Sequence, residues 1–286
     1  MTIGLLISGD LGNVALCHFL KNHDLKFVMT DYASNKIIES CNINKIPLYI
    51  GSPKNLKINS FIKNKKCNIL ISVNYIFLID KNIINLASGL CFNIHGSLLP
   101  KYRGRTPHVW AIINNDQETG ITAHIIDEGC DTGPILEQIK VPIDLNDSGW
   151  DILEKYKKLY IPLIERVIKK YSLNQLNIID QDERKATFFP KRTPDDGLID
   201  WNWNSIRIMN WVRAQKYPYP GAFTFYKNDK IIIDSVSKVN YKNNRNIKNG
   251  TIVCIKPLIV KCSDSAIKIN KIRSTNKTFD LNEILN

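Results

Sequence analysis

The sequence predicts an α/β fold: a Rossmann-like, mostly parallel sheet with flanking helices, followed by a small β-rich domain. Two observations carry this prediction. In the first half of the 286 residues, short runs of Ile, Leu and Val alternate with amphipathic segments, which is the pattern of βαβ units. After residue 200, short strand candidates follow one another between turn residues, which favours a barrel-like or open β-domain. We therefore expect one domain over residues 1–200 and a second over 201–286.

The first half is expected to supply most of the parallel sheet, whose carboxyl strand ends would hold the site. Gly9-Asp10-Leu11-Gly12 follows the first strand. It lacks the third glycine of a dinucleotide-binding turn, so a tight strand-to-helix turn is favoured. Residues 53–64 are a weaker helical candidate, because Pro53 suits a helix start but several β-branched residues follow. The remaining predicted strands are Ile3–Ile7, Lys26–Met29, Pro47–Ile50 and Asn68–Val73, and the predicted helices are Asn13–Lys21 and Lys36–Cys41.

The second half begins with a predicted pair of strands, Ile121–Ile126 and Pro134–Val141. Apolar residues at helical spacing then predict one long helix over Trp150–Tyr171, interrupted near Pro162. A helix over Asn204–Ala214 is expected to join the two domains. The predicted strands of the small domain are Phe223–Tyr226, Lys230–Val236, Thr251–Ile255, Leu258–Lys261 and Ala266–Ile269.

Composition points to a globular protein with an ordinary core. Hydrophobic residues make up 44% and charged residues 23%. The net charge of +12 would suit a nucleic-acid or phosphorylated partner, but lysine is abundant everywhere, so a solvated surface is favoured. Seven scattered cysteines without a C-x-x-C pair suggest neither a disulfide framework nor a zinc site. The apolar start resembles a buried strand and not a signal peptide, so we expect a cytoplasmic protein without membrane attachment.

The segment from Phe92 to Gln138 holds the densest set of chemically useful residues. Asn93 and His95 end an apolar run, so in an extended segment they point to the same side. An irregular glycine-containing loop follows, and Asp131 sits between two glycines at a later turn. An amide, an imidazole and a carboxylate at strand ends suit acyl transfer to an amine. The amide and imidazole would stabilise the oxyanion, and the carboxylate would orient the imidazole and relay a proton.

Each of these residues also has an ordinary structural interpretation. An asparagine before a loop commonly caps or turns the chain, and an aspartate between glycines is common in turns. A single histidine at a strand end is often structural. Whether the three side chains meet is not decided by residue spacing.

The motifs of this segment resemble those of the folate-dependent formyltransferase family. The first is Phe92-Asn93-Ile94-His95-Gly96-Ser97-Leu98-Leu99-Pro100-Lys101-Tyr102-Arg103-Gly104. It is followed in order by Glu118-Thr119-Gly120-Ile121-Thr122 and by Asp127-Glu128-Gly129-Cys130-Asp131-Thr132-Gly133. The resemblance implies an active enzyme with Asn93, His95 and Asp131 as catalytic residues, N10-formyltetrahydrofolate as co-substrate, and no metal.

The resemblance also places the pterin ring of the folate against backbone atoms of two loops. One loop precedes the catalytic strand and the other precedes the catalytic aspartate. The residues implied are Tyr75, Ile76, Leu78, Ile125, Asp127 and Glu128.

Within the family, the second half resembles the enzymes that formylate amino sugars on nucleotide diphosphates. Two segments carry this resemblance, Thr187–Trp201 and Val212–Phe223. Methionyl-tRNA formyltransferase is the alternative, since it shares two domains and would explain the charge. The basic residues after residue 240 are diffuse, however, and form no arginine-rich stripe. Glycinamide ribonucleotide formyltransferase is shorter, and a non-catalytic folate or nucleotide binder would have lost part of the catalytic set.

The resemblance implies a 3-amino or 4-amino 6-deoxyhexose as acceptor, carried on dTDP, with UDP and GDP left open. The product would enter surface-polysaccharide synthesis such as lipopolysaccharide O-antigen. Relatives are often dimers, so a homodimer is expected. Cationic side chains beside a loop can bind the pyrophosphate of a nucleotide sugar. A tyrosine ring can stack on the base of the nucleotide. The predicted substrate contacts are Ser8, Lys101, Tyr102, Arg103, Arg105, Lys191 and Tyr219, with Arg192 as a further cation.

Overall fold

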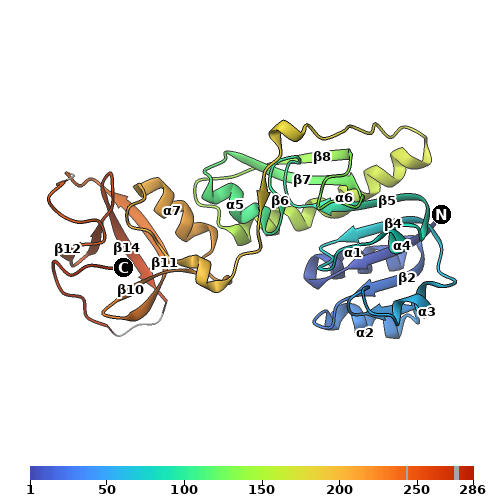
Figure 1. The fold of residues 1–286 in the computed structure, drawn as a ribbon, viewed down its shortest axis with the longest axis horizontal. Helices are drawn as coiled ribbons and strands as arrows, with labels where there is room; N and C mark the ends of the chain where they lie inside the picture. Colours follow the sequence, from blue (N-terminus) through green and yellow to red (C-terminus); the bar gives the residue numbers. More distant parts are fainter. Residues whose placement is uncertain (243, 274–276) are drawn as a thin grey trace. The chain divides into compact units, whose positions relative to one another are not determined.

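The computed structural model describes residues 1–242, 244–273 and 277–286. The chain forms two compact units, each built from several stretches of sequence (Figure 1). Met1–Gly104, Gly120–Val141 and Lys155–Phe188 form the first unit, and Arg105–Thr119, Pro142–Glu154 and Phe189–Asn286 form the second. The predicted domain boundary after residue 200 stays a prediction.

A seven-stranded sheet organises the first unit, in the order β3-β2-β1-β4-β5-β7-β8. The first five strands in this order pair in parallel, and β7 pairs antiparallel with β5. The mostly parallel α/β fold predicted from the sequence is confirmed. The strands are β1 (Thr2–Ile7), β2 (Asp24–Thr30), β3 (Leu48–Ile50), β4 (Cys67–Val73), β5 (Ala87–His95), β7 (Glu118–Ile125) and β8 (Ile135–Pro142).

The parallel strands are apolar because helices and loops cover them on both faces. Five of the six residues of β1 are buried, as are six of the seven in β4. Helix α1 packs on β1, β2 and β4, and α2 packs on β2 and β3. The helices of the first unit are α1 (Gly9–Asn22), α2 (Asn35–Ile43), α3 (Ile58–Ile62), α4 (Lys81–Ile84) and most of α6 (Gly149–Ser172), whereas α5 (Pro107–Ile113) belongs to the second unit.

The predicted interruption of the long helix near Pro162 is wrong, because α6 runs unbroken from Gly149 to Ser172. Proline removes one N–H donor from the helix, and the carbonyl of Lys158 loses that partner. Pro162 and Lys158 are both exposed, so water can hydrate this carbonyl. Leu163 and Ile164 next to the proline are fully buried, and this packing holds the helix together. The weak helical candidate at residues 53–64 reduces to the short α3.

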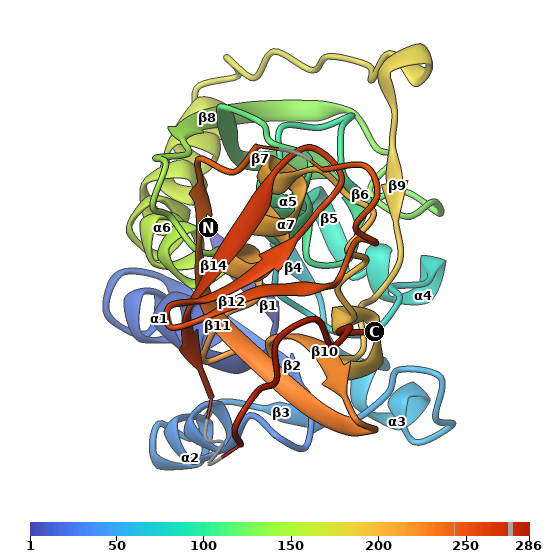
Figure 2. The same ribbon diagram turned by 90° about the vertical axis from the view of Figure 1, so that its left-hand side faces the viewer.

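An antiparallel sheet organises the second unit, in the order β10-β11-β14-β13-β12, and most of its strands can be followed in Figure 2. Helix α7 (Ser205–Ala214) packs against β11 and against α5. The predicted β-rich C-terminal region is therefore confirmed. Its strands are β10 (Ala222–Tyr226), β11 (Asp229–Val239), β12 (Ile252–Ile255), β13 (Leu258–Lys261) and β14 (Ala266–Ile272).

Two short 3-10 helices, η1 (Glu183–Lys185) and η2 (Pro194–Gly197), and two short strands complete the described elements. The strands are β6 (Arg103–Gly104) and β9 (Phe188–Phe189), which pair with each other.

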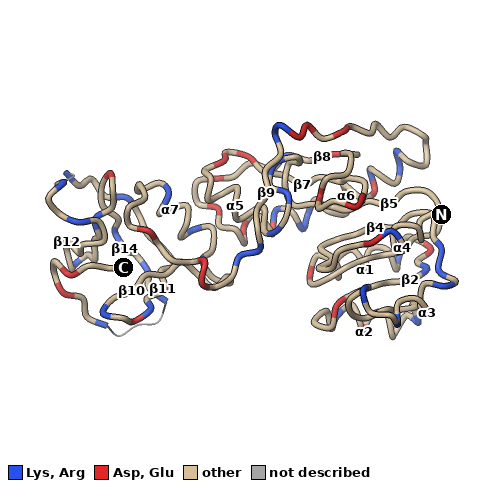
Figure 3. Tube along the Cα trace, in the orientation of Figure 1, with Lys and Arg blue, Asp and Glu red and all other residues tan. Residues whose placement is uncertain are grey.

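Basic residues are spread along both units and alternate with acidic ones (Figure 3). This distribution agrees with a charge carried by ordinary surface lysines. All seven cysteines are free, and four of them are buried. No helix in the described part of the chain has the length and apolar character required to cross a bilayer.

Candidate active site

The end of β5 places Asn93 and His95 at the carboxyl edge of the sheet. Residues two apart on a strand share a face, and here Asn93 is half-buried while His95 is buried. The Nε2 atom of His95 donates a hydrogen bond to the carbonyl oxygen of Tyr102, at 2.8 Å. This bond puts the proton of the neutral ring on Nε2 and leaves Nδ1 with a free lone pair.

The loop after His95 is held in shape by its own hydrogen bonds. The Ser97 hydroxyl donates to the carbonyl of Lys101, and the Thr122 hydroxyl donates to the carbonyl of Ser97, each at 2.6 Å. Tyr102 has a φ of 62°, an uncommon conformation for a bulky residue. Its N–H donates to the Thr187 hydroxyl at 2.8 Å, which helps hold that conformation. The Tyr102 carbonyl, which accepts the hydrogen bond from His95, is therefore held in place.

Asp131 lies on a tight turn between β7 and β8. The carboxylate of Asp127 accepts hydrogen bonds from the Gly129 N–H and the Thr132 hydroxyl, which shapes the turn. A Cβ at Gly133 would lie 1.9 Å from the carbonyl oxygen of Ile125, so only glycine fits there. The Gly104 N–H donates to Oδ2 of Asp131 at 2.9 Å and fixes the direction of its side chain.

The structure brings the three predicted catalytic side chains together. Nδ1 of His95 lies 3.5 Å from Oδ2 of Asp131. Asn93 is connected to Asp131 through His124. Nδ2 of Asn93 lies 3.1 Å from Nε2 of His124, and Nε2 of His124 lies 3.6 Å from Oδ1 of Asp131. We call Asn93, His95, His124 and Asp131 the strand-end cluster.

Burial and neighbouring charges shift the pKa values of His95 and Asp131 in the strand-end cluster. Burial lowers the pKa of His95, and the Asp131 carboxylate and the Tyr102 carbonyl offset this only in part, so the imidazole is neutral at pH 7. Burial opposes ionisation of Asp131, but His95, His124 and the Gly104 N–H outweigh it and hold its pKa well below its usual range. A neutral base therefore sits beside a carboxylate that stays ionised.

His124 is the site residue that the sequence analysis missed. It lies on β7, directly opposite Asn93 in the antiparallel pairing with β5. Its Nδ1 donates to the carbonyl of Ile125 at 2.9 Å, which leaves Nε2 to accept from the Asn93 amide. The signal available in the sequence was a histidine in a predicted strand close before Asp131. Its relevance depends on β7 pairing with β5, which residue patterns did not reveal.

The two loops predicted to hold folate lie near each other at this edge of the sheet. Tyr75 from the first loop and Ile126 from the second pack against the same group of buried residues. Lys81, at the start of α4, forms an ion pair with Glu128 of the second loop. Ile76 and Leu78 are 42% and 69% exposed, so the first loop presents apolar surface to solvent. Ile125 and Asp127 belong to the end of β7 and the turn after it.

Four of the predicted substrate contacts belong to the first unit. Ser8 is buried at the end of β1, at the same edge of the sheet as His95, and Lys101 is exposed on the loop. Tyr102 contributes its carbonyl to His95, as described above. Arg103 is fully buried, and its guanidinium already binds Gln181 and Glu183. We therefore assign Arg103 to support of the loop, in place of the predicted phosphate contact.

The other predicted contacts belong to the second unit. Arg105 and Lys191 are exposed, and the Tyr219 hydroxyl lies 2.9 Å from Nε2 of His108. Arg192 stacks on the rings of Trp110 and Trp211, at 5.0 and 4.4 Å from their centroids. Its guanidinium also donates to the carbonyl of Asp196 at 2.7 Å. This cation is therefore engaged in packing within its own unit.

Comparison with known proteins places these features in a family. Residues 22–168 match the family described as formyl transferase, and residues 191–286 match the formyl transferase C-terminal domain. The chain is 35% identical over 247 residues to the bifunctional polymyxin resistance protein ArnA of Wigglesworthia glossinidia brevipalpis. That match covers 84% of this chain but only 37% of the length of the relative.

Solved structures of the same fold include two N-formyltransferases. WlaRD, a sugar 3N-formyl transferase solved with dTDP and 5-N-formyl-THF, is 25% identical with a TM-score of 0.68, and the match covers 95% of this chain and 98% of that one. An N-formyltransferase from Helicobacter canadensis is 21% identical with a TM-score of 0.72, and the match covers 94% and 97%. Sequence and fold agree, and this chain belongs to the formyl transferase family.

Proposed function

We propose that this protein transfers the formyl group of N10-formyltetrahydrofolate to the amine of a nucleotide-linked amino deoxysugar. One observation carries the reaction type: the neutral His95 imidazole lies 3.5 Å from the ionised Asp131 carboxylate, beside the Asn93 amide. Family membership supports formyl transfer, and the likeness to WlaRD supports a sugar acceptor.

In this proposal the side chains of the strand-end cluster divide the work. The acceptor amine attacks the formyl carbon, and the Asn93 amide donates a hydrogen bond to the oxyanion that develops. Nδ1 of His95 accepts the proton that the amine loses, and the Asp131 carboxylate stabilises the imidazolium that results. The carbon bond to N10 then breaks, and His95 returns its proton to N10. One well-placed donor to the oxyanion contributes about 3 kcal/mol in the transition state.

We expect the folate to bind at the two loops around Tyr75–Leu78 and Ile125–Glu128. Exposed Ile76 and Leu78 offer apolar surface to the flat rings of a folate. Asp127 and the catalytic Asp131 lie in the same connection between β7 and β8. No step of the proposed mechanism requires a metal.

The acceptor is expected to be a dTDP-linked 3-amino or 4-amino 6-deoxyhexose destined for surface polysaccharide such as O-antigen. The crystallised WlaRD holds dTDP, and the Helicobacter canadensis enzyme holds dTDP-3-aminofucose. Exposed Lys101, Arg105 and Lys191 remain the candidate pyrophosphate contacts. We further expect a cytoplasmic homodimer without membrane attachment. We expect no nucleic-acid partner, since the basic residues are dispersed among acidic ones (Figure 3).

Release of tetrahydrofolate with a panel of acceptors tests this proposal. The panel holds dTDP-, UDP- and GDP-linked 3-amino and 4-amino deoxysugars together with methionyl-tRNA, and His95→Asn protein serves as the blank. Turnover with an amino sugar and none with tRNA is the expected result. Turnover with methionyl-tRNA alone would overturn the acceptor while leaving the formyl-transfer chemistry in place.

A further inference from the structure

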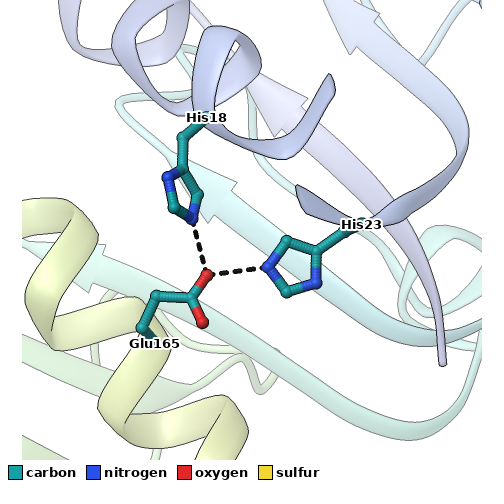
Figure 4. Close-up of side chains that lie close together, drawn as sticks. All are labelled: His18, His23 and Glu165. Carbon is teal, nitrogen blue, oxygen red and sulfur yellow. Dashed lines mark hydrogen bonds and ion pairs between the residues drawn. The ribbon is translucent and has the colours of Figure 1, made fainter. Parts of the chain in front are cut away.

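A second group of two histidines and a carboxylate lies in the first unit, outside the strand-end cluster. His18 comes from the last turns of α1, His23 follows the end of that helix, and Glu165 comes from α6. Figure 4 shows both rings directed at the Glu165 carboxylate. Each Nε2 atom lies 2.7 Å from the same oxygen, Oε1 of Glu165. We call these three residues the helix-end cluster.

The three ligand atoms are gathered as a metal site requires. They all lie within 4.8 Å of one another. Zinc bonds to histidine nitrogen and carboxylate oxygen are about 2.0–2.2 Å long, so neighbouring ligands of a tetrahedral zinc are about 3.3 Å apart. The present contacts of 2.7 Å are hydrogen bonds, and an opening of roughly half an ångström would admit the ion.

The surroundings fix the two rings and leave room for a solvent ligand. The ring of His23 packs 4.9 Å from that of Phe19, a fully buried side chain, and the N–H of His23 donates to the Phe19 carbonyl. The Asn22 amide lies 3.3 Å from Nδ1 of His18. The same amide nitrogen donates to the His18 carbonyl at 2.9 Å, so Asn22 closes the end of α1 beside the His18 ring. The side chains of His18, His23 and Glu165 are 25%, 18% and 38% exposed, so water can complete the coordination.

The electrostatic setting favours a cation. The carboxyl end of a helix carries a partial negative charge, and His18 and His23 lie at that end of the 14-residue α1. Glu165 adds a full negative charge. Two imidazoles and one carboxylate suit Zn²⁺ better than Mg²⁺ or Ca²⁺, which prefer all-oxygen ligands.

We propose that the helix-end cluster is a zinc-binding site in which His18, His23 and Glu165 coordinate one Zn²⁺ and join α1 to α6. The scattered cysteines and the family resemblance had led us to expect no metal, and Glu165 lies 147 and 142 residues from His18 and His23 in the chain. His23 directly precedes β2, whereas His95 ends β5, which runs parallel to β2 in the same sheet. The zinc site therefore lies at the opposite edge of the sheet from the strand-end cluster, and it stabilises the fold without taking part in the reaction. This inference is independent of the proposed function.

Metal titration of the untagged, chelator-treated full chain tests the proposal. We expect one equivalent of Zn²⁺ to bind per chain, Co²⁺ to give the visible absorption of tetrahedral nitrogen and oxygen coordination, and the Tm to rise in proportion to ln(1 + [Zn²⁺]/Kd). His18→Asn, His23→Asn and Glu165→Gln should each weaken zinc binding by about a hundredfold or more, because losses of 10–100-fold follow even from changes around the ligands.

Matched controls separate this site from the other zinc-binding groups of the chain. Glu137 on β8 pairs with Lys170 of the same helix α6, so Glu137→Gln also removes a carboxylate bonded to α6 but should keep zinc. His95→Asn and Cys17→Ser should keep it as well. Tm values without zinc establish that each variant folds. Absence of stoichiometric zinc binding by the wild-type chain would overturn the proposal, and so would binding that survives the changes at His18 and His23.

Discussion

The strand-end cluster and the helix-end cluster of the first unit each contain two histidines and one carboxylate, but the contacts between ring and carboxylate differ. In the helix-end cluster both rings contact one carboxylate oxygen at 2.7 Å, and the side chains are partly exposed. In the strand-end cluster the rings stand 3.5 and 3.6 Å from a carboxylate that is only 14% exposed. There, each ring is held instead by a backbone carbonyl, that of Tyr102 or of Ile125.

This difference shows how the backbone prepares a histidine for chemistry. A ring whose proton is committed to a carbonyl presents its other nitrogen as a base. A ring that bonds directly to a carboxylate is already paired, and its partner is better placed to share a cation. The residue types alone do not distinguish a reactive cluster from a structural one. The distinction lies in the hydrogen bond that each ring nitrogen makes, because the partner of one nitrogen sets the protonation of the other.

The largest expected effect is on turnover when His95 is changed. His95→Asn removes the base at similar volume and should lower kcat by about 10²–10⁴-fold. If the two clusters are independent, this variant keeps the zinc-dependent rise in Tm. Steady-state tetrahydrofolate release and thermal melts provide the two measurements. Retention of more than a tenth of wild-type kcat would contradict the role of His95.

Asp131→Asn tests whether the carboxylate acts in the reaction or only in the turn. The change keeps the shape but removes the charge that stabilises the imidazolium, so kcat should fall by roughly 10²-fold or more while folate still binds. Folate affinity can be followed by equilibrium titration of 5-formyltetrahydrofolate. A parallel loss of binding and turnover would instead identify Asp131 as a structural residue of its turn.

His124 is expected to act as a positioning residue through Asn93. His124→Ala removes the acceptor of the Asn93 amide, and the resulting misplacement should lower kcat by up to about 10²-fold. His124→Gln retains a hydrogen-bonding side chain and should recover part of that loss, with KM for folate little changed. Equal rates for the two variants would show that the bond to Asn93 does not position the amide.

The smallest effect concerns pH. Because burial lowers the pKa of His95 from its usual value of about 6.5, the base stays neutral down to a pH below that value. The acid limb of kcat/KM should therefore lie below about pH 6.5. Asp131→Asn removes a charge that raises the pKa of His95, so histidine ring NMR should show a further decrease. An acid limb above pH 6.5 would point to a different titrating group.

Local patterns of the sequence were sufficient for most of the fold and for part of the site. Apolar runs identified the parallel strands, and the motif resemblance identified Asn93, His95 and Asp131, because each of these residues lies inside one of the quoted motifs. The burial of Arg103 was missed, since its partners Gln181 and Glu183 are 78 and 80 residues away. His124 was missed because it lies between two of the motifs and meets Asn93 only through the pairing of β7 with β5. The helix-end cluster was missed because His18 and Glu165 are 147 residues apart. Pairing across such separations depends on strand order and helix packing, which residue patterns do not specify.

The segment between the two family matches, residues 169–190, has a consequence for protein engineering. Its Gln181 donates to the carbonyls of Asp131 and Gly133, its Glu183 holds Arg103, and its Thr187 accepts from the Tyr102 N–H. A chimera that joins this amino-terminal half to a foreign carboxyl-terminal half should therefore be cut after Phe188. A junction placed at residue 168 would respect the family boundary but discard the side chains that hold the Asp131 turn and the Tyr102–Arg103 loop.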